Sequence, residues 1–459
     1  MSILIKNGIL VNPEGSGPAD VLTTDDIVSI VSPVSLNYDA DRVIDAAGMY
    51  ILPGGIDPHV HMHLPSAAGH SSDDFLSGSR AALFEGTTTI IDFVTPEKGD
   101  PLPVALEKRM KEAESSLTDF SFHVSPVEWR NSTPDEIKEC IRMGVTSFKV
   151  YMAYKKTIGL DDDDLLKVMK AVGKAGGTVT VHCEEGDEIE KLRDQYFRND
   201  PANPLCHALS RPAELEASAV HKAIRLAAKA DCLLYIVHVS SKESLEHIRQ
   251  ARLNKQPVFA ETCPQYLLLD ESKYYGNFEQ TAGFVISPPL RTHDDNMALW
   301  EALADGTLDT VGTDHCPYTM RQKRAGADDF RKIPGGAGGA EHRLQLLYTY
   351  GLLTKRLNFN QIVNLTSAAP ARIFGLHPRK GTIKAGSDAD LVIWNPDAWS
   401  TISAESHHMN CDINIYEGIQ VTGRAEYVIR GGRVMIENGE LADALTPGQY
   451  LPRRYNKKP

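Results

Sequence analysis

The middle of the chain repeats one pattern, in which a short apolar stretch is followed by a polar loop and then by an amphipathic stretch. The apolar stretches are rich in Val, Ile, Thr, Tyr and Phe, which is typical of strands buried on both faces. Eight of them occur, at residues 50–61, 87–95, 120–127, 145–152, 177–184, 233–240, 257–264 and 308–316. The pattern predicts eight strands of a parallel sheet.

The amphipathic stretches between these strands predict helices. In one of them, Leu215, Ala217, Val220 and Ile224 fall on a single stripe with helical spacing. Strands that alternate with helices indicate βα units and a parallel sheet. Eight such units in about 250 residues favour an α/β fold of the closed (β/α)8 TIM-like barrel type over an open sheet. The clearest predicted helices lie within residues 73–86, 161–177 and 213–230.

The two ends of the chain have a different pattern, with short strands separated by turns. We therefore expect the ends to pair into one small β-sandwich domain beside the barrel. The predicted division assigns residues 1–50 and 380–440 to the β-sandwich domain, 51–379 to the barrel and 441–459 to a C-terminal tail.

Composition narrows the class of protein. The chain has 459 residues, of which 42% are hydrophobic and 24% are charged, with a net charge of −13. That negative charge disfavours binding to nucleic acid or to an anionic membrane surface. No apolar run approaches the roughly 18 residues that a membrane helix needs, and the start lacks the pattern of a secretory signal. We therefore expect a cytoplasmic protein.

Side chains that can bind metals lie at the ends of five predicted strands. Any one histidine could be a hydrogen-bonded structural residue, and Asp314 could cap a helix. Together they are better explained by a shared site, because the carboxyl ends of barrel strands converge on one face. The sequence therefore predicts a metal centre there. The candidate residues are His59, His61, Lys149, His182, His238 and Asp314.

Lys149 differs from the other candidates. Its neighbours Phe148, Val150 and Tyr151 predict that it is buried, and a buried ammonium group is costly unless it is paired or neutralised. A neutral lysine amine can take up carbon dioxide to form a carbamate, which is an anion able to bridge two metal ions. The alternative is an ion pair between Lys149 and a buried carboxylate.

Several longer motifs identify a family resemblance. The stretches "HVHMHLP", "GTTTIIDF", "SFKVYMAYK", "VHCEEGD", "ETCPQYLLLD", "SPPLR" and "GTDHCPY" resemble the dihydropyrimidinase and D-hydantoinase family, a branch of the cyclic amidohydrolases in the amidohydrolase superfamily. The resemblance runs from the first barrel strand to about residue 435. It implies a TIM-like barrel, a small cyclic amide substrate and a homotetramer.

The resemblance also implies a centre of two divalent metal ions, usually zinc, with manganese or cobalt as alternatives. The ions would be bridged by a hydroxide and by carboxylated Lys149. One metal ion would be held by His59, His61, Lys149 and Asp314. The other would be held by Lys149, His182 and His238.

The implied reaction is the opening of a cyclic amide or ureide ring. The hydroxide attacks the ring carbonyl, since two cations lower the pKa of a bridging water. Asp314 accepts the proton and passes it to the departing ring nitrogen. Tyr154 resembles the family tyrosine whose hydroxyl stabilises the oxyanion, although it could also be a residue of the pocket wall.

The resemblance further implies a substrate pocket. Backbone groups around Ser287 and Gly335 would bind the ring, and Gly335 stands where relatives usually have asparagine. Leu64, Tyr151 and Ile158 match the positions that contact the exocyclic substituent. An apolar or aromatic substituent suits such side chains.

His63 narrows the choice within the superfamily. Dihydroorotases have an arginine at the position of His63, where it binds a substrate carboxylate, so an acidic ring is disfavoured here. We expect His63 to lie near the substrate entrance and not to bind metal. A 5-substituted hydantoin and a 5,6-dihydropyrimidine both remain open as substrates. The alternatives are an allantoinase-type enzyme and a non-catalytic scaffold protein of the same family.

Overall fold

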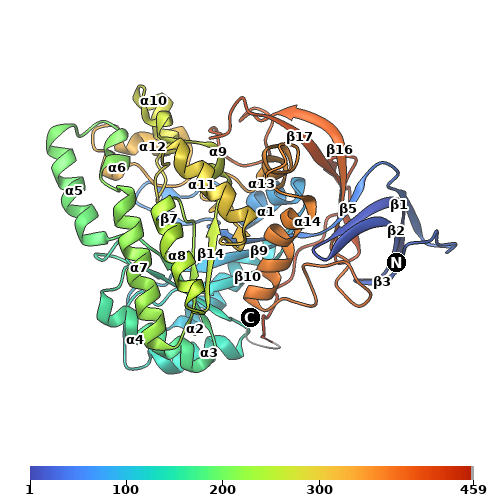
Figure 1. The fold of residues 1–459 in the computed structure, drawn as a ribbon, viewed down its shortest axis with the longest axis horizontal. Helices are drawn as coiled ribbons and strands as arrows, with labels where there is room; N and C mark the ends of the chain where they lie inside the picture. The colour runs from blue at the N-terminus through green and yellow to red at the C-terminus, as the bar shows by residue number, and fades with distance from the viewer. Residues whose placement is uncertain (456–459) are drawn as a thin grey trace.

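The computed structural model describes residues 1–455 and consists of a barrel and a β-sheet that lie side by side (Figure 1). The barrel strands pair in the order β15-β14-β13-β12-β11-β10-β9-β6, and an isolated parallel bridge from Val60 to His315 links the two ends of this sheet. The predicted TIM-like barrel is therefore confirmed. Its strands are β6 (Gly55–Val60), β9 (Thr87–Val94), β10 (Asp119–Val124), β11 (Ser147–Tyr151), β12 (Thr178–His182), β13 (Leu233–Ile236), β14 (Val258–Thr262) and β15 (Thr310–Val311).

Helices surround the barrel strands. The longer ones are α1 (Phe75–Phe84), α2 (Leu102–Glu112), α3 (Thr133–Arg142), α4 (Asp162–Ala175), α5 (Gly186–Asn199), α7 (Ala213–Ala230), α8 (Lys242–Leu253) and α11 (His293–Ala304). The shorter ones are α6 (Leu205–Leu209), α9 (Pro264–Leu268), α10 (Phe278–Thr281), α12 (Met320–Lys323), α13 (Arg343–Leu347), α14 (Phe359–Val363) and α15 (Ala369–Phe374).

Local chemistry sets the ends of these helices. The Asp161 side chain accepts a hydrogen bond from the Asp164 N–H and caps α4, while Gly176 ends the helix with a φ of 83°. In α7 the predicted stripe is buried at Ala217, Val220 and Ile224, so this helix packs as its periodicity indicates.

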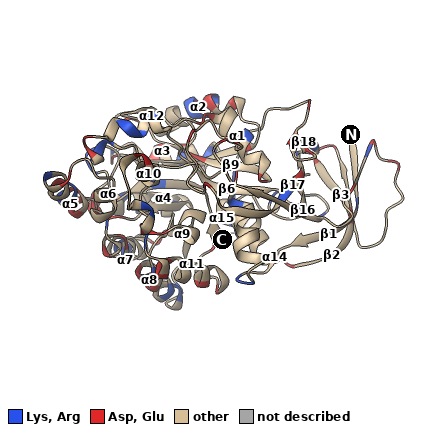
Figure 2. Ribbon diagram, turned by 90° about the horizontal axis from the view of Figure 1, so that it is seen from above, with Lys and Arg blue, Asp and Glu red and all other residues tan. Residues whose placement is uncertain are grey.

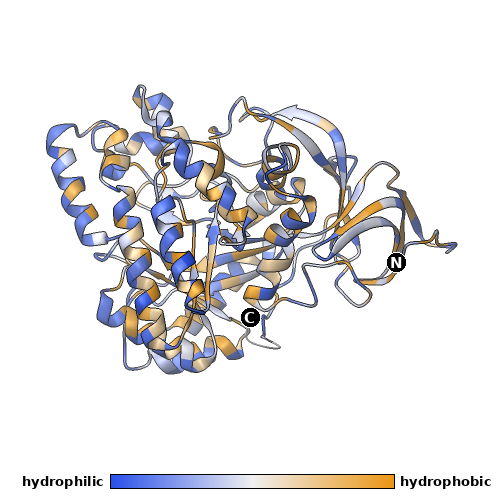
Figure 3. Cartoon of the chain, in the orientation of Figure 1, coloured by the Kyte–Doolittle hydropathy of each residue, from blue (hydrophilic) through white to orange (hydrophobic). Residues whose placement is uncertain are grey.

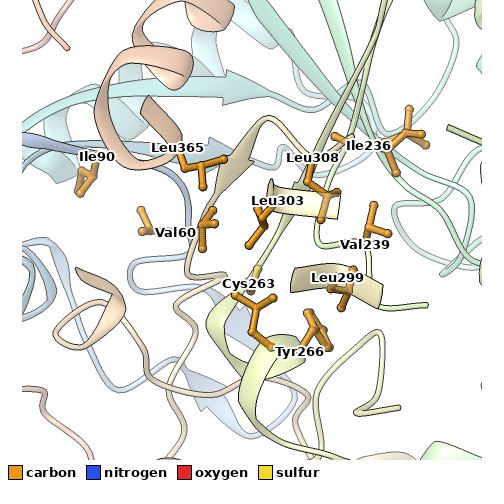
Figure 4. Close-up of a cluster of buried hydrophobic side chains, with 14 of the residues drawn as sticks. Val60, Ile90, Ile236, Val239, Cys263, Tyr266, Leu299, Leu303, Leu308 and Leu365 are labelled. Atoms are coloured by element: carbon orange, nitrogen blue, oxygen red, sulfur yellow. The ribbon is translucent and has the colours of Figure 1, made fainter. Parts of the chain in front are cut away.

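The core lies between the strands and this helical layer. Figure 3 shows apolar residues along the strands and alternating apolar and polar residues on the outer helices. Figure 4 shows part of the main cluster, in which Val60 and Ile236 come from strands and Leu299 and Leu303 from α11. Figure 2 shows most of the Lys, Arg, Asp and Glu residues on the outer helices and loops. Within residues 1–455 no helix combines the length and the apolar character needed to cross a bilayer.

The stretch 50–61, expected as one strand, is two strands. β5 (Tyr50–Pro53) joins the terminal sheet, and β6 begins the barrel. Gly54 separates them, and a Cβ at this position would collide with the Thr88 side chain. The absence of a side chain at Gly54 therefore lets the chain pass from one sheet to the other.

The chain ends, which were expected to pair into a small β-sandwich domain, form a nine-stranded mixed sheet. Its strands follow the order β19-β18-β17-β16-β5-β1-β2-β3, with β4 paired to β1. The sheet has its own apolar cluster, which includes Ile3, Val21, Ile51, Ile393 and Ile429. Besides β5, its strands are β1 (Ser2–Asn12), β2 (Gly15–Thr24), β3 (Ile27–Ser32), β4 (Arg42–Asp45), β16 (Leu391–Thr401), β17 (Gln420–Arg430), β18 (Arg433–Glu437) and β19 (Glu440–Leu441).

The segment after β19 packs against the barrel. The Leu451 N–H donates to the Phe120 carbonyl at 2.8 Å, and the Arg453 N–H donates to the Gly144 carbonyl at 2.8 Å. The Arg453 side chain is buried and donates to Ser147 Oγ and to the Phe122 carbonyl. Of the tail expected over 441–459, residues 456–459 lie outside the described residues.

A buried cation joins the barrel to the terminal sheet. Lys380 Nζ lies 2.7 Å from Asp119 Oδ2, at the start of β10, and 2.5 Å from Asp390 Oδ2, just before β16. Arg430 Nη1 lies 3.5 Å from Asp119 Oδ1. The ammonium of Lys380 therefore compensates two buried carboxylates from different parts of the fold.

We predict that Lys380→Met lowers the free energy of unfolding by about 3–5 kcal/mol, because removal of one partner leaves a buried charge uncompensated. Urea unfolding followed by circular dichroism measures the change. Lys384→Met, at an exposed position nearby, is the control and should change stability by less than about 0.5 kcal/mol. Equal unfolding midpoints for the two variants would contradict this role of Lys380.

Candidate metal centre

The six candidate metal-binding residues all lie at the carboxyl ends of barrel strands. Parallel pairing from β6 to β15 places these ends on one face. His59 is in β6 and His61 follows it, Lys149 is in β11, His182 ends β12, His238 follows β13, and Asp314 follows β15.

His59, His61 and Asp314 form the first group. Asp314 Oδ1 lies 3.1 Å from Nε2 of His59 and 3.1 Å from Nε2 of His61. One ligand atom from each residue lies within 4.8 Å of the other two. This compact set of two imidazoles and one carboxylate can hold a divalent cation.

A second carboxylate determines which nitrogen of His59 is available. Glu261 is fully buried, and its Oε1 lies 2.6 Å from His59 Nδ1. Glu261 Oε2 accepts a hydrogen bond from the Tyr235 hydroxyl at 2.8 Å. The carboxylate therefore assigns the ring proton to Nδ1 and leaves a lone pair on Nε2. His59 Nε2 is buried and makes no hydrogen bond within the described residues. Its lone pair faces Asp314 Oδ1, which is also an electron-pair donor. A cation bound between these two atoms would be coordinated by both.

His182 and His238 form the second group. His182 Nδ1 lies 2.9 Å from His238 Nε2. His182 Nε2 lies 2.7 Å from Glu184 Oε2, which also accepts a hydrogen bond from Arg211 Nη1 at 2.5 Å. Glu184 thus directs the ring proton of His182 to Nε2 and turns the Nδ1 lone pair toward His238. The His182–His238 ring centres are 4.6 Å apart, and those of His59 and His238 are 5.4 Å apart, so the two groups adjoin.

Lys149 is buried, as its neighbours predict. Its Nζ lies over the rings of Phe93 and Tyr151, at 4.9 Å and 5.2 Å from their centres, and forms no ion pair with any residue from 1 to 455. Burial lowers the pKa of Lys149 to about 8, although Asp314 and Glu261 oppose the shift. The alternative of a direct ion pair with a buried carboxylate is therefore wrong for the described residues, and a reactive amine fits the site.

The charges of His59, His61 and Asp314 favour the binding of a cation. Burial opposes ionisation of Asp314, but His59 and His61 outweigh it and hold the pKa of this carboxyl well below its usual range. Burial also lowers the pKa of His61 to about 4, so this imidazole is neutral and can donate a lone pair. Burial opposes protonation of His59 as well, but Asp314 and Glu261 overcome it and raise its pKa to about 9, so His59 binds a second proton near neutral pH, and a bound cation would replace this proton on Nε2. The excess negative charge around His59 is what a bound cation would balance.

Tyr154 lies beside the second group. Its ring centre is 5.4 Å from that of His182 and 5.5 Å from the guanidinium carbon of Arg211. Its carbonyl accepts hydrogen bonds from the N–H groups of Thr157, Ile158 and Gly159, which tightens the loop after β11. Its hydroxyl has no hydrogen-bond partner among the described residues, so it is free to donate to a ligand.

The predicted ring-binding segments lie next to each other. A Cβ added at Gly335 would lie 3.7 Å from Ser287 Oγ, although the two residues are far apart in the chain. Behind Ser287, His207 Nε2 donates to the Ile286 carbonyl at 2.8 Å. Ser287 is half-buried and Gly335 is exposed.

The residues predicted to contact the substituent come from separate segments of the chain. Leu64 lies in the loop that leads from β6 to the hairpin of β7 (Pro65–Ser66) and β8 (Gly69–His70), while Tyr151 ends β11 and Ile158 lies in the next loop. His63 is not part of the grouped metal ligands. Its ring stacks on that of His70, with centres 4.0 Å apart.

The residues behind the histidines were not predicted from the sequence. Glu261 and Glu184 orient His59 and His182, and Arg211 neutralises Glu184. The sequence carries a signal for Glu261, which is an acidic residue inside the apolar strand "PVFAET". An acidic residue there indicates a buried partner, but it does not say which one.

Comparison with known proteins gives consistent matches. The model of the amidohydrolase family matches residues 50–435. The chain is 41% identical to a D-hydantoinase of Geobacillus stearothermophilus, over 99% of this chain and 97% of that protein. It is 39% identical to a dihydropyrimidinase of Arabidopsis thaliana, over 98% and 85% of the two chains. The crystal structure of dihydropyrimidinase from Brevibacillus agri superposes with a TM-score of 0.98, at 39% identity and with complete coverage of both chains.

We predict that Glu261→Gln weakens the binding of divalent metal by about 10- to 100-fold, because it removes the charge that orients His59. Titration of the metal-free protein with zinc, monitored by calorimetry, measures the affinity. Glu301→Gln, at an exposed position, is the matched control. An affinity equal to that of the control would show that Glu261 does not support the metal site.

Proposed function

This chain belongs to the amidohydrolase family, in the group of the dihydropyrimidinases and D-hydantoinases, and is a metal-dependent cyclic amidohydrolase. We propose that it opens the ring of a 5-substituted hydantoin or a 5,6-dihydropyrimidine to give the N-carbamoyl amino acid. The proposal rests mainly on one observation. Two adjoining sets of imidazole lone pairs lie beside the buried amine of Lys149 and the unpaired hydroxyl of Tyr154.

We propose that these residues hold two divalent cations, most simply zinc. His59, His61 and Asp314 would bind one and His182 and His238 the other, with the carbamate of Lys149 shared between them. When bound, the cations supply Lewis-acid activation of a water molecule near neutral pH. The carbamate would form when the neutral Lys149 amine attacks carbon dioxide and loses a proton, which converts a buried neutral amine into an anion whose charge the cations would compensate.

The remaining chemistry belongs to side chains of the protein. Asp314 Oδ1 is within reach of the site and is held ionised, so it can accept the proton of the attacking water and return it to the leaving ring nitrogen. The Tyr154 hydroxyl would donate to the oxygen that becomes negatively charged at the ring carbonyl. Arg211, whose guanidinium lies over the Tyr154 ring, helps to hold that ring in place.

The substrate would be held by its ring and by its substituent. Backbone groups of Ser287 and Gly335 would bind the ring ureide, while Leu64, Tyr151 and Ile158 would contact an apolar or aromatic substituent. The stacked His63 would lie at the entrance. The complete set of six metal-site residues argues against the scaffold alternative, since a non-catalytic protein has no need of them.

We predict that the protein with bound zinc opens dihydrouracil or D-5-phenylhydantoin with a kcat/KM at least about 100-fold above that for dihydroorotate, because no arginine is available for the carboxylate of dihydroorotate. Production of the N-carbamoyl product, followed by chromatography, measures the rates. Allantoin and both enantiomers of isopropylhydantoin complete the panel. Preference for allantoin would favour the allantoinase-type alternative, and no ring opening of any kind would refute the proposal.

We predict that Lys149→Ala binds fewer metal ions per chain than the wild type and loses at least about 100-fold in kcat, since an anionic ligand of both ions is removed. Short carboxylic acids should restore part of both properties by taking the place of the carbamate. Metal analysis and the ring-opening assay measure the two effects. Lys170→Ala, at an exposed position of α4, is the control, and full activity of Lys149→Ala would rule out the carbamate.

A further inference from the structure

Lys323, the last residue of α12, is a buried cation without a carboxylate partner among the described residues. Only 1% of its surface is exposed. Its ammonium donates hydrogen bonds to three backbone carbonyls, those of Val285 at 3.0 Å, Pro334 at 2.8 Å and Gly336 at 2.8 Å. These three contacts use all the N–H donors of a lysine.

Such a residue is costly to keep. Burial lowers the pKa of Lys323 to about 7, although Cys316 and Cys411 oppose the shift. An apolar side chain of similar length would avoid this desolvation. The presence of a lysine therefore indicates that the contacts with the three carbonyls matter.

The three carbonyls belong to the two segments that are proposed to bind the substrate ring. Val285 precedes Ser287 by two residues, and Pro334 and Gly336 flank Gly335 on both sides. The Gly336 N–H also donates to the Val285 carbonyl at 3.0 Å. Within residues 1–455, the backbone N–H and carbonyl groups of Ser287 and Gly335 form no hydrogen bond, so these groups are free to bind a ligand.

We propose that Lys323 is a positioning residue, whose ammonium holds the segments 285–287 and 334–336 at the spacing needed to bind both sides of a cyclic amide. This inference rests on the proposed function, in which the ring is bound at Ser287 and Gly335. Lys323 does not touch the substrate. It acts by holding in place the backbone groups of Ser287 and Gly335, which would bind the substrate ring.

Electrostatics explains why a cation is needed at this point. Three carbonyl oxygens that converge on one position repel one another, and a shared ammonium converts this repulsion into attraction. Removal of the ammonium would leave this repulsion uncompensated and let the two segments shift, and a displacement of about 1 Å in a binding group can cost about 100-fold in kcat/KM.

The helix that carries Lys323 is itself anchored. Thr319 and Gln322 form a capping box at its start, and the Met320 N–H donates to Asp412 Oδ1 at 2.7 Å. Gln322 Nε2 donates to the His70 carbonyl at 2.7 Å, which ties α12 to the hairpin near His63. Lys323 therefore extends from an anchored helix to the segments 285–287 and 334–336.

The test compares three variants. Lys323→Met keeps the length of the side chain but removes all donors, whereas Lys323→Gln keeps two N–H donors. Arg321→Met removes a positive charge at an exposed position of the same helix and is the matched control. For each, kcat and KM are measured with dihydrouracil and D-5-phenylhydantoin, together with bound metal per chain and the melting temperature.

We expect Lys323→Met to raise KM by about 10- to 100-fold, with kcat changed by less than about threefold and with the metal content of the wild type. Lys323→Gln should lie between Lys323→Met and the wild type, and Arg321→Met should match the wild type. If Lys323→Met does not fold, a raised KM of folded Lys323→Gln supports the inference and an unchanged one overturns it.

Two other outcomes separate this inference from the proposed function. In the first, the wild type opens rings, but folded Lys323→Met has an unchanged KM, or loses bound metal together with kcat. This outcome overturns the proposed role of Lys323 and leaves the proposed function standing. A wild type that opens neither ring overturns the proposed function and this inference with it.

Discussion

The closure of the barrel between β6 and the segment after β15 is the contact on which the metal centre depends. Val60 and His315 form a parallel bridge, and the His61 N–H donates to the His315 carbonyl at 2.8 Å. This contact brings His61 beside Asp314, although some 250 residues separate them in the chain. The His315 ring secures the same point, because its Nδ1 accepts from the N–H groups of Gly339 and Ala340 and its Nε2 lies 3.1 Å from Asp73. A ring of strands can thus hold a small site rigidly from distant parts of the sequence.

The side chains around the site then determine which atoms face inward. Glu261 and Glu184 each bind one nitrogen of a histidine and so expose the other. His238 and Asp314 have positive φ values of 39° and 53°, a strained conformation that persists only where the surroundings enforce it. The arrangement is therefore preorganised, and a ligand need not supply the energy to orient these groups.

The sequence predicted the barrel and the six strand-end residues because both depend on local patterns, namely apolar strands and metal-binding side chains at their carboxyl ends. It did not predict Glu261 as the partner of His59, since that contact depends on how β6 and β14 are aligned on either side of β15 in the closed barrel. The division of residues 50–61 at Gly54 was also missed, because the apolar pattern continues across it and only the nearby Thr88 shows why a glycine is needed. Lys323 lies in a polar stretch that resembles an ordinary surface helix, and its burial arises from loops more than ten residues away.

The pairing of the two chain ends has a consequence for synthesis on the ribosome. β5 pairs with β1 on one side, but its other edge pairs with β16, which is made more than three hundred residues later. Until then the nascent chain carries an exposed strand edge, which can associate with other chains. Arg453, which binds the Phe122 carbonyl and Ser147 inside the barrel, arrives later still. Both parts therefore complete their native contacts only after β16 and Arg453 have been synthesised, and until then the open edge of β5 is the part of the growing chain that a chaperone would have to cover.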